Sequence, residues 1–121
     1  MLKPSVFKDA RGIFYETYNQ KIFEKLTGLN IDFVQDNQSV SAYGVLRGLH
    51  FQHGERAQAK LVRVVKGKVL DIVVDLRMDS ETFGKSFSVI LDDVENLQLF
   101  VPRGFAHGFI TLSEESIFSY K

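Results

Sequence analysis

Lys60–Lys66 and Lys68–Asp75 read KLVRVVK and KVLDIVVD, two runs rich in β-branched residues on either side of Gly67. Runs of this length and composition are typical of β-strands, and a single glycine between them is typical of a tight turn. We therefore expect two strands joined as a hairpin at Gly67. Asp71 and Asp75 flank an apolar stretch of the second run, so we interpret them as strand-end or turn residues and not as catalytic groups.

Further short runs of strand type occupy most of the remaining chain, and turn signals such as Asp92-Asp93 and Pro102-Arg103-Gly104 separate them. Many short strands with no helix between them favour an antiparallel sandwich or barrel over alternating βαβ units. The predicted runs are Asp32–Val34, Gly44–Phe51, Lys85–Leu91, Asn96–Val101, Gly108–Leu112 and Ile117–Tyr120.

The N-terminal part of the chain differs from this pattern. Residues 4–17 are expected to be extended, with a tight turn at Asp9–Gly12. Residues 19–29 form the one convincing helix, with Asn19 as its cap and Gly28 as its stop. Its apolar stripe of Ile22, Phe23 and Leu26 is expected to pack into the core.

Length and composition set broad limits on function. A chain of 121 residues predicts a single domain, and fifteen basic residues balance fifteen acidic ones. Zero net charge gives no electrostatic reason to expect nucleic acid or an anionic membrane as partner. The absence of cysteine excludes disulfides, thiolate metal sites and a cysteine nucleophile. With no signal-like or membrane-spanning apolar run, a cytoplasmic protein is the simplest interpretation.

Arg47–Gln52 (RGLHFQ) combines a cation, a histidine and an amide on one short extended segment. Side chains of a strand alternate between faces, so Arg47 and Leu49 should point one way and Gly48 and His50 the other, unless a bulge intervenes. A histidine with a near-neutral pKa is a candidate proton-transfer group. The segment alone favours the simpler interpretation, a half-buried histidine that has no chemical role.

Three kinds of site remain open from the residues alone. A metal site would use His50, His53, His107 and Glu55, although residues three apart on a strand face opposite sides. Metal-free acid–base catalysis would use His50 as base, Lys60 or Arg47 as the cation near a developing negative charge, and Tyr120 as acid.

The third possibility is an anion site for a diphosphate, built from Arg11, Arg47, Arg63 and Lys60, although no glycine-rich phosphate-binding loop is present. The residues proposed for acid–base catalysis also have simpler explanations. Lys60 and Arg47 would then be solvated surface charges, and Tyr120 would be an aromatic residue of an edge strand.

Taken together, the chain resembles the dTDP-4-dehydrorhamnose 3,5-epimerase family. Matching stretches occur along nearly the whole chain and in the order of the family, which makes the resemblance specific. They are DARGIFYE at 9–16, FVQDNQSVS at 33–41, LRGLHFQ at 46–52, QAKLV at 58–62, DIVVDLR at 71–77, FG at 83–84, VPRGFAHGF at 101–109 and YK at 120–121.

The resemblance implies an all-β, cupin-like jelly-roll sandwich with one short helix near the N-terminus. It implies a homodimer that needs no metal and no cofactor. The implied substrate is dTDP-4-dehydro-6-deoxy-D-glucose, inverted at carbons 3 and 5 on the way to dTDP-L-rhamnose, a precursor of lipopolysaccharide and cell-wall polysaccharide.

The resemblance also assigns expected roles to residues of this chain. His50 matches the base that removes the proton beside the ketone, Tyr120 matches the acid on the opposite face, and Lys60 matches the cation near the enolate oxygen. Substrate contacts are expected at Arg47 and His107. Nucleotide contacts are expected at Arg11, Phe14, Glu16, Gln35, Asp36 and Asn37, and those of Arg11 and Glu16 reach across the dimer in the family.

The chain ends at Ile117–Lys121, within a strand pattern, which indicates either a terminal edge strand or a truncated polypeptide. Family members continue past the Tyr-Lys pair with further strands, a second tyrosine and an acidic partner for the catalytic histidine. We therefore expect residues 1–121 to be one epimerase-type domain, C-terminally truncated relative to the family. Alternatives are an epimerase acting at carbon 5 only, a dTDP-sugar-binding module without turnover, and a metal-dependent cupin.

Overall fold

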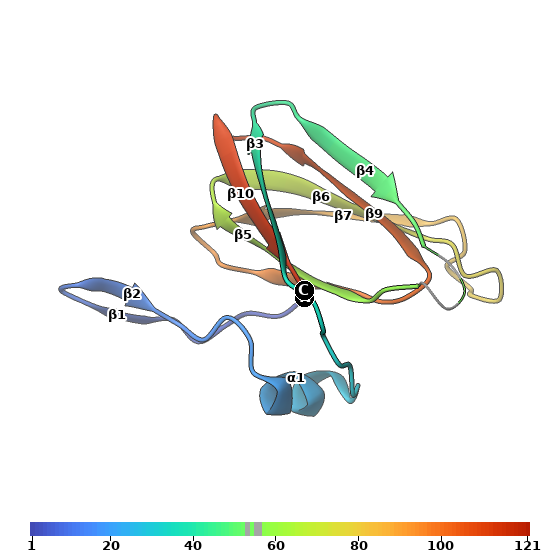
Figure 1. The fold of residues 1–121 in the computed structure, drawn as a ribbon, viewed down its shortest axis with the longest axis horizontal. Coiled ribbons are helices and arrows are strands. Elements are labelled where there is room, and N and C mark those ends of the chain that lie inside the picture. Colours follow the sequence, from blue (N-terminus) through green and yellow to red (C-terminus); the bar gives the residue numbers. More distant parts are fainter. Residues whose placement is uncertain (53, 55–56) are drawn as a thin grey trace.

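Two four-stranded antiparallel sheets face each other in the computed structural model, which describes residues 1–52, 54 and 57–121 (Figure 1). The predicted all-β jelly-roll sandwich with one short helix is confirmed. Sheet I contains, in spatial order, β3 (Asn37–Ala42), β10 (Glu115–Tyr120), β5 (Lys60–Lys66) and β8 (Gln98–Val101). Sheet II contains β4 (Leu46–His50), β9 (Phe105–Thr111), β6 (Lys68–Asp75) and β7 (Ser86–Asp92).

The two strands around Gly67 have the predicted bounds, but the predicted hairpin is wrong. β5 pairs with β10 and β8, whereas β6 pairs with β9 and β7, so the chain crosses from one sheet to the other at Gly67. Each strand buries valines on its inner face, Val62 and Val64 on β5 and Val69 and Val73 on β6. Such faces can be buried side by side or face to face, and here they pack across the sandwich.

The hydrophobic core fills the space between the sheets. Its central contact is a stack of Phe109 on β9 and Phe118 on β10, with ring centroids 4.1 Å apart. These rings come from different sheets, so their contact ties the two layers together. The buried core residues are Val62, Val64, Val69, Val73, Leu91, Leu99, Val101, Phe109 and Phe118.

The helix α1 (Gln20–Thr27) begins and ends where the sequence predicts. The Asn19 side chain accepts a hydrogen bond from the backbone N–H of Ile22, and Gly28 closes the helix with φ of +70°. Phe23 is buried against the rings of Phe33 and Phe100, but Ile22 and Leu26 are exposed, so the expectation of a buried stripe is wrong for these two. Among the described residues, no helix is long and apolar enough to span a membrane.

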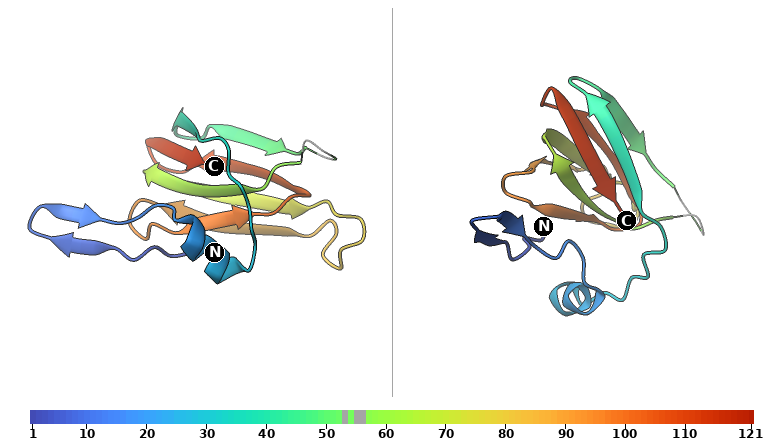
Figure 2. Two further views of the ribbon diagram at one scale, coloured as in Figure 1. Left: turned by 60° about the horizontal axis from the view of Figure 1, so that its bottom comes forward. Right: turned by 60° about the vertical axis from the view of Figure 1, so that its left-hand side comes forward.

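A small hairpin of β1 (Phe7–Asp9) and β2 (Gly12–Phe14) projects away from the sandwich, and both views of Figure 2 show it clear of the two sheets. The predicted turn at Asp9–Gly12 is confirmed, with Asp9 accepting hydrogen bonds from Arg11. Its apolar residues Phe7, Ile13 and Phe14 are exposed.

The largest difference from the sequence prediction concerns β3. Asn37–Ala42 was not predicted as a strand because it is polar, whereas the predicted strand at Asp32–Val34 is irregular and Val34 is exposed. The inward-facing residues of β3 are Asn37, Ser39 and Ser41. A strand whose inner face is polar lacks the alternation on which a strand prediction depends.

The last strand, β10, pairs with β3 on one side and with β5 on the other. It is therefore an interior strand of sheet I, and the interpretation of Ile117–Tyr120 as a terminal edge strand is wrong. Its inward-facing residues Ser116, Phe118 and Tyr120 run from the core toward one open end of the sandwich.

Candidate active site

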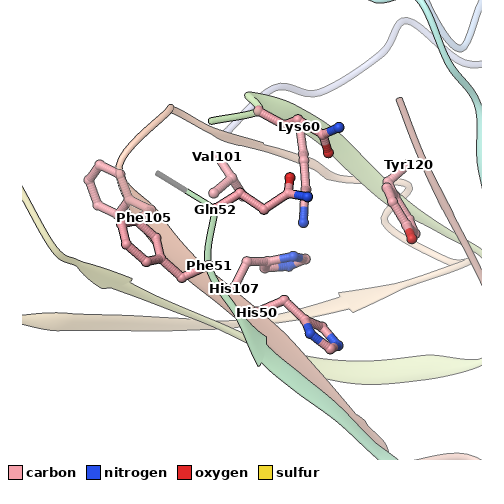
Figure 3. A pocket seen from close by; sticks show the side chains of 9 residues that line it. His50, Phe51, Gln52, Lys60, Val101, Phe105, His107 and Tyr120 are labelled. Carbon is pink, nitrogen blue, oxygen red and sulfur yellow. The ribbon is translucent and has the colours of Figure 1, made fainter. Parts of the chain in front are cut away.

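Two adjoining cavities of about 330 and 400 Å³ lie between the sheets at one end of the core. Both are lined by His50, Lys60, His107 and Tyr120, which are four of the residues that the sequence singles out. In Figure 3, His50 and His107 come from sheet II, and Lys60 and Tyr120 extend toward the same space from sheet I. Proton-transfer groups and a cation thus meet in one cavity from opposite layers.

A bulge in β4 decides where His50 points. Arg47 lies opposite Phe109 and His50 lies opposite His107, so β4 has one residue more than β9 over this length. At Gly48, φ is +102° and an added Cβ would lie 2.6 Å from the carbonyl oxygen of His107, which only glycine avoids. In a regular strand Arg47 and His50 would face opposite sides; with the bulge, both line the larger cavity.

His107 is held by a buried carboxylate that the sequence interpretation missed. Its Nε2 lies 2.9 and 3.0 Å from the two carboxylate oxygens of Asp71, and Asp71 is completely buried. Asp71 is in the middle of β6, so its interpretation as a strand-end or turn residue is wrong. The signal was present, because a period of two places Asp71 on the same face as Val69 and Val73.

Asp75, by contrast, is the last residue of β6 and does hold the following turn. Its carboxylate accepts hydrogen bonds from Arg77, Ser80 and Thr82. The Arg77 hydrogen bonds hold the pKa of Asp75 far below its usual range. The strand-end interpretation of Asp75 is therefore confirmed.

Lys60 and Tyr120 form the opposite wall of the site. The Lys60 ammonium lies 5.6 Å from the centroid of the Tyr120 ring, within the range of a cation–π contact. Burial lowers the pKa of Lys60, and the negative charge of Asp71 opposes this shift in part. The cation is therefore partly shielded from water, and its field on a bound ligand is stronger than in bulk water.

Arg47 is fixed at the edge of the larger cavity by β3. Its Nε donates to the Ser41 hydroxyl at 2.9 Å and its Nη2 donates to the Val40 carbonyl at 3.3 Å. Two contacts to a neighbouring strand hold the planar guanidinium in one orientation. Arg47 is thus a positioned side chain and not a freely solvated charge.

A third cavity of about 340 Å³ includes Asp36 and Asn37 together with Arg63 and Lys121. Lys121 donates to the Asp36 carboxylate at 2.7 Å, and Gln35 donates to the Asn37 side chain at 2.8 Å. The predicted nucleotide segment Gln35–Asn37 thus lies beside a polar cavity with two cations, separate from the cavities of His50.

Comparison with known proteins adds a family to this geometry. The family model for dTDP-4-dehydrorhamnose 3,5-epimerase matches residues 1–121. The chain belongs to this family. The curated dTDP-4-dehydrorhamnose 3,5-epimerase of Salmonella typhimurium is 55% identical over 121 residues, which cover 100% of this chain and 66% of that protein.

Solved structures give the same result. The dTDP-4-dehydrorhamnose 3,5-epimerase of Elizabethkingia anophelis, known from a crystal structure, is 62% identical in sequence to this chain. The two structures superpose with a TM-score of 0.92, over 98% of this chain and 65% of that one. The epimerase of Legionella pneumophila, solved in complex with dTDP-4-keto-L-rhamnose, is 48% identical with a TM-score of 0.95, over 98% of this chain and 63% of that one. The chain therefore spans about two thirds of the length of these family members.

The other residues that the family resemblance singles out lie away from the central cavities. Arg11 and Phe14 line a shallow hollow of the β1–β2 hairpin, and Arg11 is bonded to Asp9. Glu16 lies by the helix and accepts a hydrogen bond from Asn19 at 3.2 Å. Within a single chain these three residues do not join His50, so their expected contacts across a dimer stay a prediction.

The metal alternative depends partly on residues that the structure does not describe. His53 and Glu55 lie outside the described residues. Within residues 1–52, 54 and 57–121, no three histidine or carboxylate side chains gather as a metal-binding group. The carboxylate nearest to a histidine here, Asp71, is already bonded to His107 Nε2.

Proposed function

We propose that this protein epimerises dTDP-4-dehydro-6-deoxy-D-glucose at carbons 3 and 5 and so forms dTDP-4-dehydro-L-rhamnose, the precursor of dTDP-L-rhamnose. The observation that carries the proposal is the placement of His50 and Tyr120 on opposite sheets around one cavity that Lys60 also lines. Inversion needs removal of a proton from one face and its return to the other, and this cavity offers a different group on each side.

The first step is removal of a proton from the carbon beside the ketone. His50 takes the proton, the electron pair of the broken C–H bond forms a carbon–carbon double bond, and negative charge moves to the ketone oxygen. Lys60 stabilises that charge as a partly buried ammonium, an effect of roughly 3–4 kcal/mol for a single oxyanion donor. Its pKa, lowered by burial, also makes it able to share a proton with the enolate oxygen.

The second step returns a proton from the opposite face. Tyr120 donates its phenolic proton to the same carbon, the ketone reforms, and the configuration at that carbon is inverted. The sequence is repeated at the other carbon after exchange of protons with solvent. No cofactor takes part in this scheme, since the substrate ketone itself accepts the electron pair.

Arg47 and His107 are proposed to bind the substrate rather than move its protons. The bonds of Arg47 to β3 and of His107 to Asp71 fix both side chains at the cavity wall. Fixed donors orient a ligand at low entropic cost. The Legionella relative binds dTDP-4-keto-L-rhamnose, and we propose that the present cavity takes the same class of sugar.

The protein is further proposed to act as a cytoplasmic homodimer. The exposed Phe7, Ile13 and Phe14 of the projecting hairpin support this assembly, because an apolar surface on a thin hairpin gains most from burial against another chain. In such a dimer, Arg11 and Glu16 would reach across to the nucleotide bound by the second chain. Light scattering that gives the mass of a single chain at micromolar concentration would contradict the dimer.

Deuterium uptake tests the proposed function. The protein is incubated with dTDP-4-dehydro-6-deoxy-D-glucose in heavy water, and NMR measures exchange at each sugar carbon. We expect deuterium at carbons 3 and 5, loss of exchange in His50→Ala, and unchanged binding of dTDP by that variant. Exchange at one carbon would indicate a narrower epimerase, and binding without exchange would indicate a module without turnover.

A further inference from the structure

The Ser39 hydroxyl oxygen is the one buried side-chain nitrogen or oxygen in the described part of the chain that has no hydrogen-bond partner. Buried polar groups in folded proteins are nearly always paired, because an unpaired one has lost its water and gained nothing in return. An exception therefore calls for a reason, and ligand binding is one such reason.

The neighbouring hydroxyls show how the fold treats such groups. Ser41, two residues along the same inner face of β3, accepts a hydrogen bond from Arg47 at 2.9 Å. Ser116 on β10 is completely buried and is bonded to the Thr111 hydroxyl at 2.8 Å. The sandwich thus pairs its other inward hydroxyls with side chains and leaves Ser39 open.

Ser39 has a definite place in the site. It lies beside Phe118 in the register of β3 and β10, and it lines the cavity of about 400 Å³ that also contains His50 and Lys60. Asp36 and Asn37, in contrast, line the separate cavity that we associate with the nucleotide. The position of Ser39 therefore points to the sugar end of a bound substrate.

We propose that Ser39 is a sugar-binding residue whose hydroxyl gains its missing partner only when the hexose enters. Rotation about its Cα–Cβ bond turns the oxygen toward the cavity, where it donates to, or accepts from, a ring hydroxyl or carbonyl oxygen. The fixed Arg47 and the His107–Asp71 pair have protein partners already, whereas the free hydroxyl of Ser39 is available in full. This inference rests on the proposed function, since it requires that a nucleotide-linked hexose occupies the cavity.

The test compares two ligands that differ only by the sugar. Calorimetry measures the affinities of wild-type protein and Ser39→Ala for dTDP and for dTDP-glucose, which lacks the ketone and does not react. We expect Ser39→Ala to bind dTDP-glucose about three- to tenfold more weakly, the loss of one hydrogen bond, and to bind dTDP as the wild type does. Its midpoint of thermal unfolding should not fall, because no bond within the protein is lost.

Ser116→Ala is the matched control, because it removes a hydroxyl that has a partner. We expect its unfolding midpoint to fall and its ratio of dTDP-glucose to dTDP affinity to stay at the wild-type value. Equal affinity of Ser39→Ala and wild type for dTDP-glucose would overturn the inference, as would equal weakening for both ligands. A wild-type protein that binds neither ligand would overturn the proposed function, and the inference with it.

Discussion

Asp71→Asn should destabilise the protein and change the site at the same time. The substitution keeps the shape of the side chain but removes the charge that faces His107 at 2.9–3.0 Å in a fully buried place. A hydrogen bond to a charged group contributes about 1.5–3 kcal/mol and a neutral one about 0.5–1.5 kcal/mol. The difference predicts a loss of roughly 1–2 kcal/mol in the free energy of unfolding.

For a domain of this size, such a loss lowers the midpoint of thermal unfolding by about 3–10 °C. Circular dichroism melts at pH 7 measure it directly. Asp79→Asn is the control, because Asp79 is an exposed carboxylate in the turn after β6, and the midpoint of this variant should not change. Equal midpoints for Asp71→Asn and wild type would refute the reasoning, since the His107–Asp71 pair would then contribute nothing to stability.

A second readout concerns Lys60. The charge of Asp71 raises the pKa of Lys60 against the opposing effect of burial, so its removal should lower that pKa further. Lys60 would then lose its proton at a lower pH, and the alkaline limit of deuterium uptake should move to lower pH in Asp71→Asn. An unmoved alkaline limit would mean that Lys60 does not control that limit through its charge.

Three further outcomes are expected. Phe118→Ala should lower the free energy of unfolding in urea by about 3–5 kcal/mol, since it removes a fully buried ring stacked on Phe109; a loss below 1 kcal/mol would contradict the core assignment. Hydrogen bonds from Arg77 lower the pKa of Asp75, so the contribution of Asp75 to stability is present above the unfolded-state pKa near 4 and is lost as the pH falls. Asp75→Asn should therefore weaken the dependence of the free energy of unfolding on pH in the acid range. An unchanged dependence would rule this out. Lys60→Met should raise the unfolding midpoint at pH 7, because partial burial disfavours the ammonium, and it should abolish deuterium uptake. A lower midpoint would show that the charge stabilises the fold.

The sequence predicts the strands of the fold better than it predicts their partners. The bounds of β5 and β6 are as predicted because both runs are rich in β-branched residues and a turn residue, Gly67, separates them. Their pairing is not, because a hairpin and a crossing between sheets bury the same faces and differ only in long-range contacts. β3 was missed altogether, since its inner residues face a cavity and not the apolar core.

The candidate site shows the same division. His50, Lys60, His107 and Tyr120 were named from sequence and line common cavities, although their chemical roles stay predictions. The prediction for Asp71 is wrong because a carboxylate beside an apolar run is typical of a strand end. Only the register of β6 against β9, which places Asp71 beside Phe109 and Val73 beside His107, brings its carboxylate to an imidazole.

The strands also explain why core and site cannot be separated in this fold. Along the inner face of β5, Val64 and Val62 lie in the core and Lys60 lies in the cavity, two residues further on. The inner face of β10 continues in the same way from Phe118 to Tyr120. Because side chains alternate with a period of two, a shift of either strand by one residue would expose its core residues and turn its reactive group outward together. The register that buries the core is thus the register that assembles the site, and a substitution that loosens the core near Phe118 should reduce proton exchange before it unfolds the chain.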